Sequence, residues 1–283
     1  MCPPPSRCLD PRQSSAILGR RGTGAPPLAG PVSRTVPAPR ACSSLGHLRW
    51  RNLPPTRLGP VNDSGIIGYT TVRGEHRHET DVRRSRFITV VRRIASEDEA
   101  RLLLTELRRE FHDARHHCSA VVLGPDRSVQ RANDDGEPSG TAGAPMLDAI
   151  LKRDNADGEA DLSDVAVVVV RYFGGVLLGA GGLVRAYSDA VSQALDSAPR
   201  VRRRLLQLLA VPVAHTDAGR VENELRNAGV DVLGTDYAAE RATIRVAIPA
   251  GNASIDGFRA RLASLTAGQS GAQLLDLKWV DCD

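Results

Sequence analysis

A glycine-rich segment at positions 171–185 has the residue types expected of an anion-binding loop. It reads RYFGGVLLGAGGLVR and follows an apolar run. Glycine lets the backbone turn tightly and approach a ligand, and the free N–H groups at the start of a following helix attract anions. Flanking arginines could add charge-assisted contacts. The predicted phosphate-binding residues are Arg171, Gly174, Gly175, Gly179, Gly181, Gly182 and Arg185.

A structural interpretation of the same glycines is equally open. They could serve only to let a strand and a helix pack closely around a tight turn. Neither G-x-G-x-x-G nor G-x-x-x-x-G-K-[ST] is present, so no standard nucleotide-binding fingerprint is met.

A second candidate segment is acidic and reads NDDGEPSGTAG over residues 133–143. The carboxylates of Asp134, Asp135 and Glu137 could hold a hard cation such as Mg²⁺. The Asp-Gly and Glu-Pro steps favour a solvated turn instead, and Ser139 or Thr141 could cap the helix that follows. We therefore expect no metal and no resident cofactor, and magnesium belongs only to the alternative function.

The third candidate is His116-His117-Cys118, whose residue types suit metal binding, base catalysis or nucleophilic attack. Adjacent strand residues point to opposite faces, so both histidines cannot easily bind one ion. One histidine could face the acidic segment. A small buried thiol beside surface histidines is the favoured interpretation, so no catalytic residue is assigned. The predicted wall of a site comprises His116, His117, Asp134, Asp135, Glu137, Ser139 and Thr141.

The elements that must position these segments follow from hydrophobic periodicity. Runs rich in β-branched and aromatic residues predict strands at 65–72, 87–91 and 119–123, and 128–131 is the expected hairpin partner of the last. The unbroken apolar run 165–170 predicts a central strand buried on both faces.

Helices are expected between these strands and after them. Ser96-Glu97-Asp98-Glu99 is a capping box before an apolar face that extends to Phe111. Pro145 suits the first turn of a short helix through Lys152. Val184, Tyr187, Val191 and Leu195 mark a further helix, and Pro199 with the basic run 200–204 is predicted to be a linker.

The remaining sequence predicts a second α/β unit. Strands are expected at 206–213, 230–237, 242–248 and 274–280, and helices at 217–228 and around Phe258, Leu262 and Leu265. This βαββαβ order is the ferredoxin-like pattern. The predicted fold class is therefore α+β with two domains, at 61–199 and 205–283.

Charge and composition set the N-terminal 60 residues apart. They hold nine arginines, one acid and 12 of the 18 prolines, and we expect them to be disordered. Subtracting them from totals of 37 basic and 33 acidic residues leaves 28 and 32, a net charge of −4. The segment could be a targeting peptide, a basic arm that touches nucleic acid, or a stretch upstream of a true start near Val61 or Val72. No apolar stretch reaches the roughly 18 residues that span a bilayer, so a cytoplasmic protein is expected.

Several of these segments together resemble the YigZ/Impact family over about residues 65–283. The resemblance rests on SRFI at 85–88, on 114–118, on DDGEPSGTAGAPML at 134–147 and on 168–187. It implies a first domain, of βαβ type, with the fold shared by a small-subunit ribosomal protein and the GHMP kinases. It implies a second domain similar to the C-terminal region of elongation factor G. Eukaryotic relatives regulate translation and carry a separate N-terminal partner-binding domain, which is not expected in this chain, so that role is not transferred to it.

Three functional hypotheses follow. The leading one is a non-enzymatic, cytoplasmic regulatory protein that binds RNA or the ribosome and contacts phosphates through the glycine-rich segment. The alternative is a Mg²⁺-dependent enzyme acting on a phosphorylated small molecule or nucleotide, with His116 or His117 moving protons. The third is a protein-interaction module in which these motifs are purely structural. If the acidic and glycine-rich segments line one cleft, a binding site is expected there.

Overall fold

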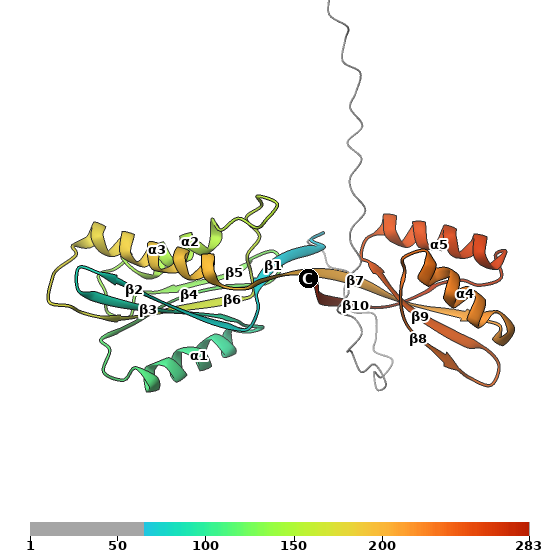
Figure 1. Cartoon of the computed structure of the whole chain (residues 1–283), viewed down its shortest axis with the longest axis horizontal. Coiled ribbons are helices and arrows are strands. Elements are labelled where there is room, and N and C mark those ends of the chain that lie inside the picture. The colour runs from blue at the N-terminus through green and yellow to red at the C-terminus, as the bar shows by residue number, and fades with distance from the viewer. Residues whose placement is uncertain (1–64, 283) are drawn as a thin grey trace, which may run out of the picture. The chain divides into compact units, whose positions relative to one another are not determined.

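The computed structural model describes residues 65–282, so the expectations for residues 1–60 lie outside the described part of the chain. The described part is α+β, with ten strands in two five-stranded sheets and five helices (Figure 1). None of those helices is both long and apolar enough to cross a membrane.

The first sheet holds the candidate site, and every neighbouring pair of its strands is antiparallel. Strands β3 and β4 both pair antiparallel with β6, so they run parallel to each other on either side of it. Helix α1 (Glu97–Glu110) connects β3 to β4. The predicted βαβ unit is therefore present in a split form, with β6 inserted between its strands. The sheet order is β2 (Glu75–Val82), β3 (Ser85–Arg93), β6 (Val165–Tyr172), β4 (His116–Leu123) and β5 (Val129–Asn133).

Helices cover both faces of this sheet, with α1 on one face and α2 (Gly143–Leu151) and α3 (Ala180–Ser197) on the other (Figure 1). Alternate residues of β6 enter two different cores. Val167 and Val169 face α2 and α3, whereas Val168 and Val170 face α1. The predicted central strand buried on both faces is confirmed.

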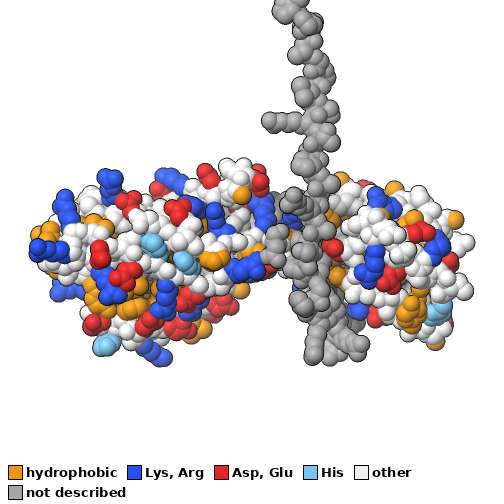
Figure 2. Space-filling view, in the orientation of Figure 1, with side chains coloured by type: hydrophobic (Ala, Val, Ile, Leu, Met, Phe, Trp, Pro, Cys, Tyr) orange, Lys and Arg blue, Asp and Glu red, His pale blue; other side chains and the backbone are white. Residues whose placement is uncertain are grey.

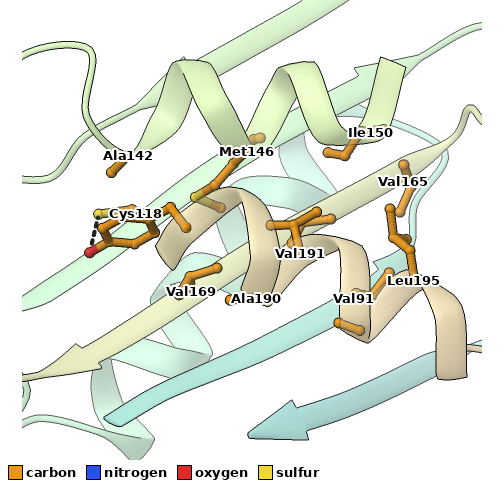
Figure 3. Packing of buried hydrophobic residues seen from close by; sticks show 14 of the residues in the cluster. Val91, Cys118, Ala142, Met146, Ile150, Val165, Val169, Ala190, Val191 and Leu195 are labelled. Atoms are coloured by element: carbon orange, nitrogen blue, oxygen red, sulfur yellow. Dashed lines mark hydrogen bonds between the residues drawn. The ribbon is translucent and has the colours of Figure 1, made fainter. Parts of the chain in front are cut away.

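The core between α2, α3 and the sheet holds these two helices against one face of the sheet. Figure 3 shows Met146 and Ile150 of α2 close to Val191 of α3, above the strands. Met146, Ile150 and Val191 are fully buried. Burying a side chain of this size contributes about 1.5–3 kcal/mol, so the packing holds the start of α3 in place.

Strand β2 was not predicted, because its sequence EHRHETDV has none of the apolar alternation used to find strands. It is an edge strand whose residues alternate between exposed and half-buried. Charged edge strands discourage pairing with other chains, and such strands leave little hydrophobic signal in a sequence.

The second sheet has the predicted βαββαβ element order. Four of its strands run β10–β7–β9–β8, the fifth, β1 (Gly68–Val72), also pairs with β7, and all pairs are antiparallel. The apolar faces of both helices enter one core with β7 and β9. The elements are β7 (Arg200–Val213), α4 (His215–Asn227), β8 (Asp231–Tyr237), β9 (Ala242–Pro249), α5 (Asn252–Thr266) and β10 (Gln273–Cys282).

The basic run 200–204 is not a linker, contrary to the prediction. It forms the first part of β7 and pairs with β1 (Gly68–Val72). Arg202 lies 2.6 Å from Asp161, and Arg203 lies 3.3 Å from Asp164. Carboxylates distant in sequence neutralise Arg202 and Arg203, and these partners cannot be read from the local composition of the run.

Candidate functional site

The acidic and glycine-rich segments line one pocket of about 470 Å³ at the start of α3. Its wall comes from Arg115 and His116, from 136–138 of the acidic segment, and from residues between Arg171 and Leu183. The acidic and glycine-rich segments therefore share one cleft, which is the arrangement expected of a binding site.

Sheet register places Arg171 at the base of this pocket. In the ladder, Arg171 of β6 lies opposite Phe87 of β3 and His116 of β4. Its guanidinium lies 5.5 Å from the Phe87 ring centroid and 5.7 Å from that of Phe173. The residue is only 5% exposed, and its Nε has no hydrogen-bond partner within residues 65–282. A buried charged donor without a partner is costly, and Arg171 lines the pocket, so a ligand contact to this side chain would be favourable.

Glu137 holds Arg171 in position through a buried ion pair. Arg171 Nη1 donates to Glu137 Oε1 at 2.6 Å, and the hydroxyl of Tyr187 donates to the same oxygen at 2.8 Å. The Cys118 thiol in turn donates to the Tyr187 hydroxyl at 3.3 Å. This chain of contacts ties β6, the acidic segment and α3 together behind the pocket.

Cys118 is fully buried in the core beneath α3, and Figure 3 shows its sulfur in the hydrogen bond to the tyrosine hydroxyl. Burial raises the pKa of the Cys118 thiol to about 12. Only the thiolate is a good nucleophile, so this cysteine is inert at neutral pH. The geometry supports the structural interpretation of Cys118.

Asp134 organises the acidic segment from within. Its carboxylate accepts the backbone N–H groups of Gly140, Ala142 and Gly143 at 2.8, 3.0 and 2.7 Å. Burial alone would raise the pKa of Asp134, but these three donors outweigh it and the pKa is lowered.

The cap of α2 differs from the prediction. The N-cap residue is Ala142, which makes no side-chain cap, and the first N–H groups bond to Asp134 instead of Ser139 or Thr141. The Thr141 hydroxyl donates to the Pro138 carbonyl, and Ser139 is exposed. A residue nine positions before the helix thus takes over the capping role.

Asp135 bonds in a different direction from the other two carboxylates. It accepts from Arg108 Nη2 of α1 at 2.6 Å and from the backbone N–H of His117 at 2.6 Å. With Asp134 on backbone amides and Glu137 on Arg171, no two of these carboxylates share a protein donor. The part of the chain from 65 to 282 has no cluster of three potential metal-ligating side chains.

The two histidines point to opposite faces of the sheet, as predicted for neighbours in a strand. His116 lines the pocket, and its Nδ1 lies 2.9 Å from the Asp135 carbonyl oxygen. His117 is 5% exposed, beside backbone carbonyls of Leu107 and Phe111 in α1, where burial lowers its pKa. Only His116 is therefore placed to meet a ligand in the pocket.

The glycines between β6 and α3 have distinct roles. A Cβ at Gly174 would lie 1.8 Å from the Arg84 carbonyl oxygen, so only glycine fits there. Gly175 and Gly179 have φ values of +83° and +74°, which side chains disfavour. Gly179 is the N-cap of α3 and supplies no side-chain acceptor.

The start of α3 is consequently open. Within the described residues, no protein group accepts the N–H groups of Ala180, Gly181 and Gly182. Gly179 and Ala180 line the pocket. Free N–H groups and the helix dipole both favour an anion at this point.

The predicted phosphate-binding residues are therefore only partly assembled. Arg171 and Gly179 line the pocket, whereas Gly174, Gly175, Gly181 and Gly182 shape the loop and helix start beside it. Arg185 lines no part of the pocket, and its Nε lies 3.6 Å from Asp189 Oδ2. Its side chain is 85% exposed.

Sequence reasoning missed the apolar wall and one cation of the pocket. The missed residues are Arg115, Phe173, Leu177, Leu178 and Leu183. Leu177 is 82% exposed and Phe173 is 46% exposed, which is unusual for large apolar side chains. The sequence did contain a signal for this wall, because Phe173 and Leu177 are bulky apolar residues in a glycine-rich loop, where core packing does not require them.

Comparison with known proteins identifies matching families for both halves. Residues 83–195 match the family described as the Impact N-terminal domain, and residues 211–269 match a domain of unknown function, DUF1949. The pocket lies within the first match.

Three bacterial relatives each match more than half of this chain. The IMPACT family member YvyE of Bacillus subtilis is 43% identical over 57% of this chain and 71% of its own. The IMPACT family member of Haemophilus influenzae is 36% identical, covering 70% of this chain and 93% of its own. The IMPACT family member YigZ of Escherichia coli is 37% identical, covering 66% and 88%. The chain therefore belongs to the IMPACT family, as the segments at 85–88, 134–147 and 168–187 indicated.

Proposed function

We propose that this protein is a non-enzymatic, translation-associated RNA-binding protein, and that the pocket at the start of α3 holds an RNA phosphate. The observation that carries the proposal is the meeting of buried Arg171, with its unpartnered Nε, and the open start of α3 in one pocket. Both features bind phosphate oxygens in proteins.

The net charge of the side chains that line the pocket favours a ligand with a single negatively charged group. Glu137 compensates the charge of Arg171, so this pair alone has little net attraction for an anion. Arg115 is exposed at the rim and forms no ion pair within the described residues. Together with the helix start, Arg115 supplies the net positive potential that a phosphate requires.

The apolar wall favours RNA over inorganic phosphate. Phe173 and Leu177 are exposed beside the phosphate-binding groups. Single-stranded RNA is commonly bound by stacking its bases on aromatic or apolar side chains while cations hold the backbone. A nucleotide with its phosphate at the start of α3 and its base against Phe173 satisfies both halves of the pocket. The resemblance to a family with translation regulators accords with an RNA or ribosomal partner in the cytoplasm.

The test is filter binding of a twelve-residue oligouridylate over a range of salt concentrations. Arg115→Gln removes the exposed cation, and Arg171→Lys keeps the charge against Glu137 but removes the planar fork. Each should weaken binding severalfold, and Arg115→Gln should reduce the log K against log salt slope by about 0.7.

Arg185→Gln is the matched control, because Arg185 is exposed on α3 but does not line the pocket. It should leave affinity nearly unchanged. Unchanged affinity and salt slope in both Arg115→Gln and Arg171→Lys would rule out this pocket as the phosphate site.

A further inference from the structure

The turn between β2 and β3 has an unusual sequence for its backbone conformation. Val82 pairs with Ser85, so Arg83 and Arg84 are the two central residues of a two-residue hairpin. Their φ values are +47° and +68°. Two left-handed residues define a type I′ turn, for which Asn-Gly is strongly preferred because other side chains are strained there. Arginine at both positions needs a reason beyond the turn itself.

The charges of this turn are also uncompensated, unlike those of the arginines around it. Arg77, Arg86 and Arg92 of the same hairpin each form ion pairs with glutamates. Arg83 and Arg84 are exposed and form no ion pair within residues 65–282. The turn therefore exposes two arginine side chains without ion-pair partners, although arginine is strained in this left-handed backbone conformation.

The turn lies directly against the loop that forms the pocket. The Arg84 carbonyl occupies the space that a Cβ of Gly174 would need. The Ser85 hydroxyl, which is fully buried, accepts from the Gly174 N–H at 3.3 Å and from Arg171 Nη2 at 3.5 Å. One buried serine thus joins the turn, the glycine-rich loop and the phosphate-binding arginine.

The surface at this end of the domain matches that arrangement. In Figure 1 the β2–β3 turn and the loop from β6 to α3 lie at the same end of the sheet, at the left. Figure 2 shows Lys and Arg side chains at this end beside hydrophobic ones, and further Lys and Arg side chains over the rest of the visible face.

We propose that Arg83 and Arg84 contact backbone phosphates of RNA that extends out of the pocket. The ligand would then be a single strand of several nucleotides and not a free nucleotide. This inference rests on the proposed function, because the pocket must hold the first phosphate. The hairpin would supply further phosphate contacts, which position a strand without reading its sequence.

The test replaces the turn by its preferred sequence, Arg83→Asn with Arg84→Gly. This variant removes two charges while relieving strain, so its melting temperature should equal or exceed that of the unaltered protein. Affinity for twelve-residue oligouridylate should fall about tenfold, with a salt slope lower by about 1.4, as for two lost single-strand contacts. Binding of uridine monophosphate, which reaches only the pocket, should be unchanged.

A charge-matched control removes two exposed helical arginines, Arg109→Gln in α1 and Arg259→Gln in α5. It should change the affinity for oligouridylate much less than the turn variant does. Equal affinity and slope for the turn variant and the unaltered protein, while Arg115→Gln still weakens binding, would overturn this inference alone. Failure of the unaltered protein to bind oligouridylate would overturn the proposed function as well.

Discussion

Arg171 Nη1 lies 2.6 Å from Glu137 Oε1, and both side chains are more than nine-tenths buried. The two residues are 34 positions apart, in the two segments that the sequence singled out separately. Their ion pair joins the acidic and glycine-rich segments into one structure, so each segment supports the other's conformation.

Removing one member of this pair should destabilise the protein strongly. Glu137→Ala leaves the Arg171 guanidinium buried without a counter-charge, which costs about 3–5 kcal/mol in comparable pairs. The measurement is the free energy of unfolding from urea denaturation. A loss below about 1 kcal/mol would contradict burial of the unpaired charge.

The double variant Glu137→Leu with Arg171→Met provides the control for this prediction. Replacing a buried ion pair by apolar side chains of similar size is often close to neutral in stability. The double variant should therefore be more stable than Glu137→Ala, and its effect should be far from the sum of the single effects.

The pKa of Asp134 predicts a specific loss of stability in acid. Three backbone donors hold this pKa below its unfolded value of about 3.9, so the carboxylate stabilises the fold fully only above that pH. Its contribution is lost as pH falls through the folded-state pKa. Asp134→Asn should lower stability at pH 7 by about 1–3 kcal/mol and make the stability less dependent on pH below 4. Unfolding free energies at pH 3 to 7 would check this, and parallel curves for the two proteins would contradict it.

Two glycines of the glycine-rich segment, one in the loop and one in the first turn of α3, should respond oppositely to alanine. A Cβ at Gly174 would overlap the Arg84 carbonyl, so Gly174→Ala should destabilise by about 1–3 kcal/mol or more. A Cβ at Gly181 would meet no atom within 4 Å, and alanine there favours the first turn of α3. Gly181→Ala should therefore stabilise by about 0.5 kcal/mol. Thermal unfolding of both variants measures the contrast, and similar effects at the two positions would be inconsistent with this packing.

The thiol of Cys118 should resist alkylation until the protein unfolds. With its pKa raised to about 12, roughly one thiol in 10⁴ is ionised at pH 8, far fewer than for an exposed cysteine. Iodoacetamide labelling followed by peptide mass spectrometry separates Cys118 from the other cysteines. The Cys118 peptide should stay unlabelled in buffer and become labelled in urea, whereas rapid labelling of the folded protein would place this thiol in an open site.

Much of the fold could be predicted from local pattern. The unbroken apolar run of β6 predicted that this strand is buried on both faces. The alternation of strand and helix periodicity in the second half of the chain predicted the βαββαβ order. The predicted N-cap was confirmed, since Ser96 Oγ accepts from the Glu99 N–H at 3.3 Å. The returning bond of the capping box is displaced by one residue, to the N–H before the N-cap. The Glu99 carboxylate accepts from the Ala95 N–H at 2.8 Å. These features are local because each depends on residues within a few positions of one another.

Elements stabilised by distant partners were missed. Strand β2 and the first part of β7 are rich in charged residues, which favour loops and linkers when judged alone. Strand β2 forms because it pairs with β3, and the first part of β7 forms because it pairs with β1 and β10. Pairing energy of this kind comes from backbone hydrogen bonds and cross-strand contacts, which leave no trace in the local sequence.

The amino-acid sequence was enough to single out the segments that could carry chemistry, because glycines, flanking arginines and clustered acids occur there in patterns that packing alone does not require. The placement of those groups followed only from the three-dimensional fold. Sheet register brought Arg171 beside His116, folding of the acidic segment turned Glu137 toward Arg171 and Asp134 toward backbone amides, and the β2–β3 turn was seated against Gly174. The physical reason is that a charge or a free N–H group is defined by what lies within a few ångströms of it, and those neighbours come from distant parts of the chain.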